Sequence, residues 1–208
     1  MTYDSLVADI EKWLERDDTN FISQIPDFIE LGQRRIANEL KILGLKVPIT
    51  SNFQANNPIV VKPDRWRETV SWNYGVGENE NTRVWVYPRT YEYCRTYWPT
   101  DTDTAPPKFY TDYDYNHWLV CPTPDSDYPI EIIIWQLPKT LSVVNQTNWL
   151  TDFAPDLIFY ASLLETAPYL KADDRLQMWK ERYDATKNAF LAQDLRRITD
   201  QTQIVFET

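Results

Sequence analysis

Apolar residues recur at helical spacing near both ends of the chain, whereas the middle of the chain is patterned differently. A first helix is predicted over residues 4–16, where Asp4 can cap its start. Its apolar stripe consists of Leu6, Ile10, Trp13 and Leu14. The polar residues 17–20 then predict a break.

A second helix is predicted to begin near Ser23, with Pro26 in its first turn, and to stop at Gly44, a residue that tolerates the left-handed conformation of a helix terminator. Its apolar positions are Phe28, Leu31, Ile36, Leu40 and Leu43. We therefore expect two antiparallel helices at the N-terminal end.

Helical spacing returns near Asp152, which can cap a third helix with Pro155 in its first turn. One broad apolar face of this helix is formed by Leu157, Ile158, Ala161 and Leu164. Pro168 is expected to end or kink it. A fourth helix is predicted to start around residues 172–174, whose carboxylates suit a helix N-terminus, and to fray near Arg197. Its core positions are Leu176, Trp179, Tyr183, Phe190 and Leu191.

Between these helices, residues 46–148 are rich in proline and aromatic residues and lack helical periodicity. Short runs of β-branched and aromatic residues between turn signals are typical of strands. Strands are predicted at residues 47–53, 59–61, 65–72, 83–87, 109–113, 118–121 and 128–137. Residues 75–81 are expected to form a loop, and residues 90–98, after Pro88, favour a short helix.

The sequence therefore predicts an α+β protein with a four-helix core built from both ends of the chain, a β-rich insertion domain and an extended C-terminal arm. The predicted halves of the helical core are residues 1–45 and 150–197, the insertion is 46–149, and the arm is 198–208. The arm contains the apolar residues Ile204, Val205 and Phe206, which could pack on their own domain or be donated to a partner as an added strand.

The composition fits one soluble domain with a sizeable insertion, because the chain has 208 residues of which 43% are hydrophobic and 25% charged. The longest apolar stretches are far shorter than the ~20 residues that cross a bilayer, and no signal segment opens the chain. We expect no membrane contact and synthesis in the cytosol. Cys94 and Cys121 lie near aromatic residues and are expected to be buried thiols rather than a disulfide.

The formal net charge of -10 argues against a protein that grips nucleic acid, since phosphate binding depends on Lys and Arg. An acidic wall would repel sliding DNA, and net charge also keeps proteins soluble; both interpretations stay open.

Few residues offer catalytic or metal-binding chemistry. His117 is the single histidine, which makes any catalytic triad depend on it, and a structural role at a turn or strand start is favoured. The four glycines form no phosphate-binding loop. Paired carboxylates leave a glycosidase arrangement open, although caps and turns explain nearly all of them. They are Asp112 with Asp114, Asp125 with Asp127, and Asp173 with Asp174. We expect no cofactor, no metal and no catalytic residue.

The aromatic residues of the insertion admit two interpretations. They could form a platform that stacks on sugars or bases, or they could serve the protein core and subunit interfaces, where Trp and Tyr are enriched. The tryptophans concerned are Trp66, Trp72, Trp85, Trp98, Trp118 and Trp135. Core and interface use is favoured.

Three stretches of the chain resemble one family. Residues 107–125 (PKFYTDYDYNHWLVCPTPD), 146–157 (QTNWLTDFAPDL) and 163–175 (LLETAPYLKADDR) are similar to the head-to-tail adaptor, or connector, proteins of tailed bacteriophages. The likeness extends over residues 107–197, and residues 91–99 share it. The shared motifs are packing and turn motifs.

The resemblance implies a structural virion protein that forms a ring, commonly of twelve copies, beneath the portal, with DNA passing through without specific binding. It implies a C-terminal arm that reaches the portal and a β domain that meets a tail component, such as a nozzle, tail tube or fibre protein. Portal contact is thereby assigned to Arg196, Arg197, Ile198, Ile204, Val205 and Phe206. The protein would be located in the neck of the virion, and in the host cytoplasm during assembly.

Two other classes of function remain as alternatives. One is a tail or baseplate module that binds carbohydrate through the Trp-rich insertion. The other is a cell-wall hydrolase that uses a pair of carboxylates, which the sequence favours least.

Overall fold

The computed structural model describes residues 1–76, 82–170 and 174–202, with side chains through Arg197. The chain forms two compact units. The helical unit comprises Met1–Leu45 and Leu137–Thr208, and the β unit comprises Lys46–Gln136. Helices and two sheets are both present, so the predicted α+β class is confirmed.

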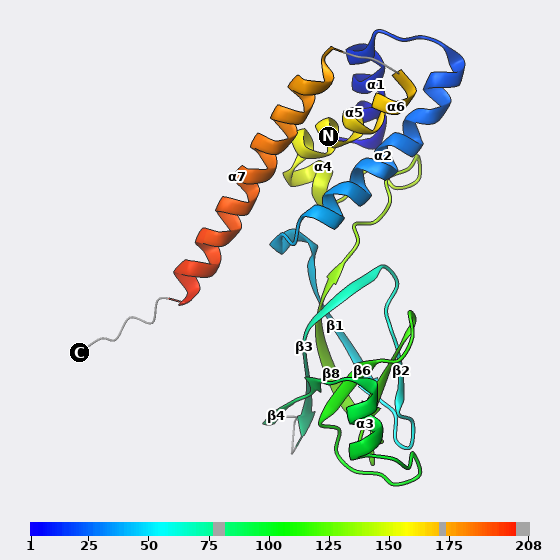
Figure 1. Ribbon diagram of the computed structural model, residues 1–208, viewed down its shortest axis with the longest axis vertical. Helices are drawn as coiled ribbons and strands as arrows, with labels where there is room; N and C mark the ends of the chain where they lie inside the picture. Colours follow the sequence, from blue (N-terminus) through cyan, green and yellow to red (C-terminus); the bar gives the residue numbers. More distant parts are fainter. Residues whose placement is uncertain (77–81, 171–173, 203–208) are drawn as a thin grey trace, which may run out of the picture. The chain divides into compact units, whose positions relative to one another are not determined.

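The helical unit is built around α5 (Pro155–Glu165), which contacts every other α-helix of the unit (Figure 1). These are α1 (Tyr3–Leu14), α2 (Thr19–Glu39), α4 (Trp149–Phe153), α6 (Ala167–Leu170) and α7 (Leu176–Thr202). Seven of the eight residues of α5 from Leu157 to Leu164, all except Tyr160, are buried, and they include the four predicted from its apolar face. A helix that is buried on all sides is the centre of its unit.

The first two helices differ from their predictions at their ends. Thr2, not Asp4, caps α1, and Trp13 is 43% exposed rather than part of the buried stripe. Asp18, predicted to break the chain, instead caps α2 by accepting a hydrogen bond from the Phe21 amide at 2.8 Å. Helix α2 therefore begins four residues earlier than predicted. Pro26 lies inside it, because the buried side chains around the proline keep the helix continuous.

The end of α2 was also predicted too far along the chain. The helix stops at Glu39, Leu40 is extended, and a short 3₁₀ helix, η1 (Leu43–Leu45), follows. Leu31 is 47% exposed, whereas Phe28, Ile36 and Leu40 are buried as predicted. Gly44 is not a helix terminator. A Cβ on Gly44 would overlap the indole ring of Trp149, so the absence of a side chain lets that ring approach.

In the C-terminal half, the third predicted helix is two helices. Asn148 caps α4, Asp152 lies inside α4, and Pro155 starts α5 without a side-chain cap. Residues 171–173, where the fourth helix was predicted to start, lie outside the described residues. Helix α7 runs to Thr202, five residues past the predicted fraying point, so the first residues assigned to an extended arm are helical.

The predicted core positions of α7 divide into two groups. Trp179 and Tyr183 are buried, at 0% and 2% exposure. Leu176 and Leu191 are exposed and Phe190 is half-buried, which corrects their predicted place in the core. The first half of α7 therefore packs closely on the body of its unit, and beyond it Phe190 still contacts Trp149.

The β unit consists of two four-stranded sheets. The first has the order β1-β8-β3-β4 and consists of β1 (Lys46–Phe53), β8 (Tyr128–Gln136), β3 (Trp66–Val76) and β4 (Thr82–Trp85). The second has the order β2-β7-β6-β5 and consists of β2 (Ile59–Val61), β7 (His117–Cys121), β6 (Phe109–Asp112) and β5 (Tyr87–Pro88). The predicted short helix after Pro88 is α3 (Tyr91–Tyr97), capped by Thr90.

Two strand predictions need correction. Strand β3 extends through Gly75 to Val76, four residues beyond the predicted end at residue 72, because its inward side chains continue to meet the core. The single strand predicted at residues 83–87 is split between β4 and β5, which belong to different sheets. The end of β8 at Gln136 leaves residues 137–149, which the sequence placed with the insertion, in the helical unit.

The two sheets face one another across an aromatic core. Trp72 and Trp118 are fully buried with ring centroids 5.0 Å apart, and Trp72 also lies 5.0 Å from Tyr110 and 5.4 Å from Phe53. Trp66, Trp98 and Trp135 are half-buried, and Trp85 is 50% exposed. Three of the six tryptophans, Trp66, Trp72 and Trp118, belong to or pack against this core, which favours the core interpretation over an open stacking platform.

Replacement of Gly44 by alanine tests the close approach of Trp149. We expect Gly44→Ala to lower the free energy of unfolding by about 1–3 kcal/mol, because the added methyl group must displace a packed ring. The same substitution in a Trp149→Ala background should cost little, since the ring is gone. Equal losses in both backgrounds, measured by urea unfolding, would contradict the assigned contact.

Candidate interaction surfaces

The C-terminal half of α7 lies uncovered. From Asn188 to Arg197 no described side chain is buried, and Leu191 and Leu195 are 42% and 65% exposed. Figure 1 shows α7, in orange and red, continuing past the helices of its own unit. Isolated helices are marginally stable in water, so an uncovered helix with exposed leucines is suited to a partner.

The first half of α7 is fixed to the helical unit by polar contacts with α2. Glu39 accepts hydrogen bonds from the Tyr183 hydroxyl at 3.0 Å and from Lys187 Nζ at 2.9 Å. Burial, followed by the nearby Glu39 carboxylate, raises the pKa of Tyr183, which therefore stays a neutral donor. One turn past Phe190, Asp194 Oδ2 accepts the Leu43 amide at 2.7 Å. Asp194 is thus the last described anchor of α7.

The residues predicted to contact a portal fall partly on this free end. Arg196 and Arg197 are exposed, and the Arg197 guanidinium lies 3.7 Å from Asp194 Oδ1. Ile198 belongs to α7, although the structure does not describe its side chain. Ile204, Val205 and Phe206 lie outside the described residues. The structure thus brings the two arginines together on one projecting helix end.

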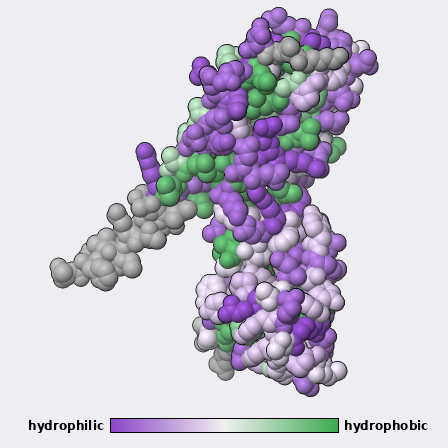
Figure 2. Space-filling model, in the orientation of Figure 1, coloured by the Kyte–Doolittle hydropathy of each residue, from purple (hydrophilic) through white to green (hydrophobic). Residues whose placement is uncertain are grey.

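A second surface, which the sequence did not predict, lies around α3 in the β unit. Helix α3 packs on β6 and β7, and it exposes three tyrosines. Tyr91 and Tyr93 are each 43% exposed and Tyr97 is 40% exposed. The signal that could have revealed it is the i,i+4 spacing of Tyr93 and Tyr97 along a short helix, which places their rings side by side. Figure 2 shows this unit mostly in pale colours, where Tyr, Trp, Thr and Pro fall on the hydropathy scale.

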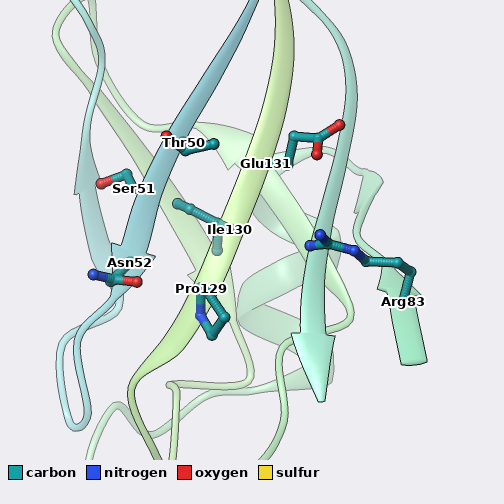
Figure 3. A pocket seen from close by; sticks show the side chains of 7 residues that line it. All are labelled: Thr50, Ser51, Asn52, Arg83, Pro129, Ile130 and Glu131. Carbon is teal, nitrogen blue, oxygen red and sulfur yellow. The ribbon is translucent and has the colours of Figure 1, made fainter. Parts of the chain in front are cut away.

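A third feature is an open hollow of about 330 Å³ on the first sheet of the β unit (Figure 3). It is lined by Thr50, Ser51, Asn52, Arg83, Pro129, Ile130 and Glu131. Arg83 extends from β4 towards β8, which carries Glu131. Among its described lining residues Glu131 is the sole carboxylate, whereas glycoside hydrolysis uses two carboxyl groups about 5–9.5 Å apart.

Most of the carboxylates that the sequence paired make structural contacts. Asp112 lies 2.7 Å from Lys62 Nζ, and Asp125 accepts the Tyr128 hydroxyl at 2.7 Å. Asp127 accepts the Ala55 amide at 2.8 Å. Asp174 is exposed, and Asp173 is outside the described ranges. These contacts join turns and strands, as capping carboxylates do.

His117 begins β7, as predicted, and binds Asp114 in the preceding turn. Its Nδ1 lies 2.9 and 3.0 Å from the two Asp114 oxygens, while the amides of Asn116 and His117 both donate to Oδ1 at 2.7 Å. The hydrogen bond from His117, with those from the two amides, lowers the pKa of Asp114. The histidine therefore orders a turn.

Lys62 is a buried cation that sequence reasoning missed. Its side chain is 3% exposed, and its Nζ donates to the Asp114 carbonyl at 2.9 Å and lies 3.8 Å from the Trp66 ring centroid. With Asp112 these groups replace the water that the ammonium loses. From the alternation of apolar and polar residues in the sequence, Lys62 is expected to follow strand β2. That pattern gives no sign that its ammonium group is buried.

The two cysteines are buried, as predicted, and both are free thiols. Burial raises the pKa of both thiols, so they are poor nucleophiles. In the described part of the chain, no three His, Cys, Asp or Glu side chains are grouped to hold a metal ion. Within the same residues, no helix has the length and apolar character needed to cross a membrane.

Replacement of Asp194 tests the anchor of α7. Asp194→Ala leaves the Leu43 amide without its acceptor and should lower the free energy of unfolding by about 1–3 kcal/mol, with faster hydrogen exchange at Leu43. Arg197→Ala is the control, since it removes only the exposed ion pair and should cost at most about 0.5 kcal/mol. Unchanged exchange at Leu43 in the Asp194 variant would show that the anchor is unimportant.

The turn at Asp114 should respond to acid. Because the folded pKa of Asp114 is lowered, its stabilising effect is present above the unfolded pKa and is lost as pH falls through the folded pKa. His117→Ala should raise the pKa of Asp114 in a carboxyl NMR titration, whereas Tyr115→Ala on the same turn should not. The assignment fails if both variants leave that pKa where it was.

Comparison with protein families identifies the family of this chain. A family model described as SU10 adaptor protein covers residues 1–204, which includes both units, all of α7 and Ile204. No curated protein matches the chain. The family match confirms the resemblance inferred from the three sequence stretches.

Proposed function

Because this chain belongs to the SU10 adaptor protein family, whose members are phage adaptor proteins, we propose that it forms a ring beneath the portal and links capsid to tail. In this role DNA passes through the ring without specific binding. The ring would hold twelve copies, as the resemblance implies. The protein would act in the neck of the virion after assembly in the host cytoplasm, as a structural rather than catalytic component.

The uncovered C-terminal half of α7 is the observation that carries this proposal. The last ten described side chains of this helix are all at least partly exposed. Phe190, beside Trp149, and Asp194, which accepts the Leu43 amide, hold this stretch to its own unit, and most of its surface stays open to a partner. Docking against the portal would bury Leu195 and pair Arg196 and Arg197 with acidic groups. Ile198, Ile204, Val205 and Phe206 continue the same contact along the chain. The four longest helices, α1, α2, α5 and α7, would form the rigid core that presents it.

The charge of the chain supports a passage for DNA. A net charge of -10 repels a polyanion at a distance, which lets DNA slide rather than stick. The tail component would dock on the β unit, whose exposed aromatic residues are typical of protein interfaces. No cofactor is needed for either contact.

Truncation after Arg197 tests the role of the helix end and arm. We expect the shortened chain to unfold at the same temperature as the full chain, because it keeps Asp194, the last described anchor of α7, yet to fail to join purified portal rings in co-sedimentation. Tyr115→Ala, an 80% exposed position in the β unit, is the control and should join portal normally. Undiminished joining by the shortened chain would remove the role proposed for this end.

The same proposal predicts the state of the protein alone. Without portal, we expect monomers in dilute solution by analytical ultracentrifugation, because the contact surface of α7 has no partner. A closed ring formed without portal would contradict this part.

A further inference from the structure

The surface around α3 combines aromatic side chains with two cations. It consists of Arg89, Tyr93, Tyr97, Lys108 and Phe109, and is called the α3 surface below. Tyr93 and Tyr97 lie on α3, Phe109 begins β6, and Arg89 and Lys108 lie in the segments that precede α3 and β6. These residues therefore come from two segments of the chain that pair side by side in the second sheet.

The rings of this surface are packed against one another. Tyr93 and Tyr97 are nearly parallel, with centroids 6.2 Å apart, and both meet Phe109 edge to face at 5.4 and 5.2 Å. Because each tyrosine covers part of its neighbour, the group does not offer the separate open ring faces on which sugars stack. Rigid tyrosines with exposed edges and hydroxyls are instead typical of protein interfaces.

The two cations of the α3 surface have no carboxylate partner among the residues that the structure describes. The Arg89 guanidinium lies 5.5 Å from the Tyr93 ring centroid and 5.3 Å from that of Phe109, and it donates to the Pro88 carbonyl. Lys108 Nζ lies 3.5 Å from the Tyr97 hydroxyl. The nearby Arg95, in contrast, is neutralised by Asp101 at 2.5 Å.

The α3 surface is complementary to a negative group from outside. Its two cations, without a carboxylate partner in the described part of the chain, lie beside exposed tyrosines in a protein that has ten more acidic than basic side chains. Arg89 also lines a cavity of about 360 Å³ together with Thr69, Pro88, Tyr110 and Thr111, among others. Two carboxylates, Glu68 and Asp112, line the same cavity, but Asp112 is already bound to Lys62.

The α3 surface is held rigidly before any partner arrives. Thr90 caps α3 and Cys94 fixes its inner side with 0% exposure. The Arg89 amide donates to the Tyr110 carbonyl at 2.9 Å, and Trp98 Nε1 donates to the Asp103 carbonyl at 2.8 Å. A surface that is already ordered loses little conformational entropy on binding.

We propose that the α3 surface binds an acidic segment of a partner protein, with a Glu or Asp carboxylate paired to Arg89 and an apolar neighbour packed on Tyr93 and Tyr97. The identification of that partner as the tail-side component rests on the proposed function. Two cations are too few to hold a nucleic acid, which requires several phosphate contacts. A protein segment that supplies a carboxylate and an apolar side chain contacts both the cations and the aromatic rings of the α3 surface.

The test uses the full chain and defined peptides. Three peptides of twelve residues share two phenylalanines and carry Glu, Gln or Lys at their remaining positions. We expect the Glu peptide to shift the NMR signals of residues 89–97 and 108–109, with affinity that falls as salt rises. The Gln and Lys peptides should bind at least ten times more weakly.

Charge reversal provides the matched comparison. Arg89→Glu with Lys108→Glu should weaken the Glu peptide at least tenfold, and Tyr93→Ala should weaken it severalfold. The control is Lys139→Glu with Lys180→Glu, which changes the net charge equally at two exposed lysines of the helical unit and should bind like the parent. Circular dichroism establishes that each variant is folded.

Several results would overturn the proposal. They are the absence of shifts with the Glu peptide, equal binding by the charge-reversed and control variants, and tighter binding of a chitin hexasaccharide or a duplex oligonucleotide at this surface. Portal co-sedimentation of the same proteins separates the two proposals. Joining to portal without peptide binding removes the α3 proposal alone. Specific peptide binding without joining to portal supports the α3 surface and removes the tail-side identity of its partner.

Discussion

The antiparallel pairing of β1 with β8 is the constraint on which the rest of this structure depends. The two strands pair over eight residues, from Lys46 with Trp135 to Phe53 with Tyr128. β1 leaves the first half of the helical unit and β8 returns to the second half, so their pairing brings the two ends of the inserted segment together. The helices can therefore pack as one unit although 91 residues separate their two halves in sequence.

Because of this pairing, the buried side chains form two separate cores, one in each unit. In the β unit, rings from both sheets meet at the buried Trp72 and Trp118, and in the helical unit the buried α5 is surrounded by the other helices. The close approach of α2 and α5 requires Gly32, whose Cβ would lie 2.9 Å from the Ser162 amide nitrogen. Outside these two cores, the C-terminal half of α7 and the α3 surface both expose apolar or aromatic side chains beside cations. Both are suited to protein partners.

Much of the fold follows from the sequence because alternation and helical spacing are local properties. Strand β2 was predicted with its observed bounds, and the apolar face of α5 and the helix after Pro88 were also confirmed. The errors arose where one residue type has two uses. Asp18 suits both a break and a cap, and Pro26 suits a first turn but is tolerated inside a helix whose neighbours are buried.

The candidate sites were less predictable, since exposure depends on packing between distant segments. Sequence spacing placed Phe190 and Leu191 in a core that α7 has already left at that point. The α3 surface requires Phe109 to lie beside α3, and the unpaired state of Arg89 and Lys108 can be seen only in three dimensions. The adaptor function was predicted from the family resemblance, because the spacing of residues alone did not indicate any function.

The central claim is that this protein's exposed apolar and aromatic side chains serve assembly with other virion proteins. Negative-stain imaging of the full chain mixed with purified portal rings tests it most directly. The account predicts a collar of added density on one end of the portal with a central opening. Portal rings that look the same with and without the chain, at concentrations well above those of assembly, would contradict it.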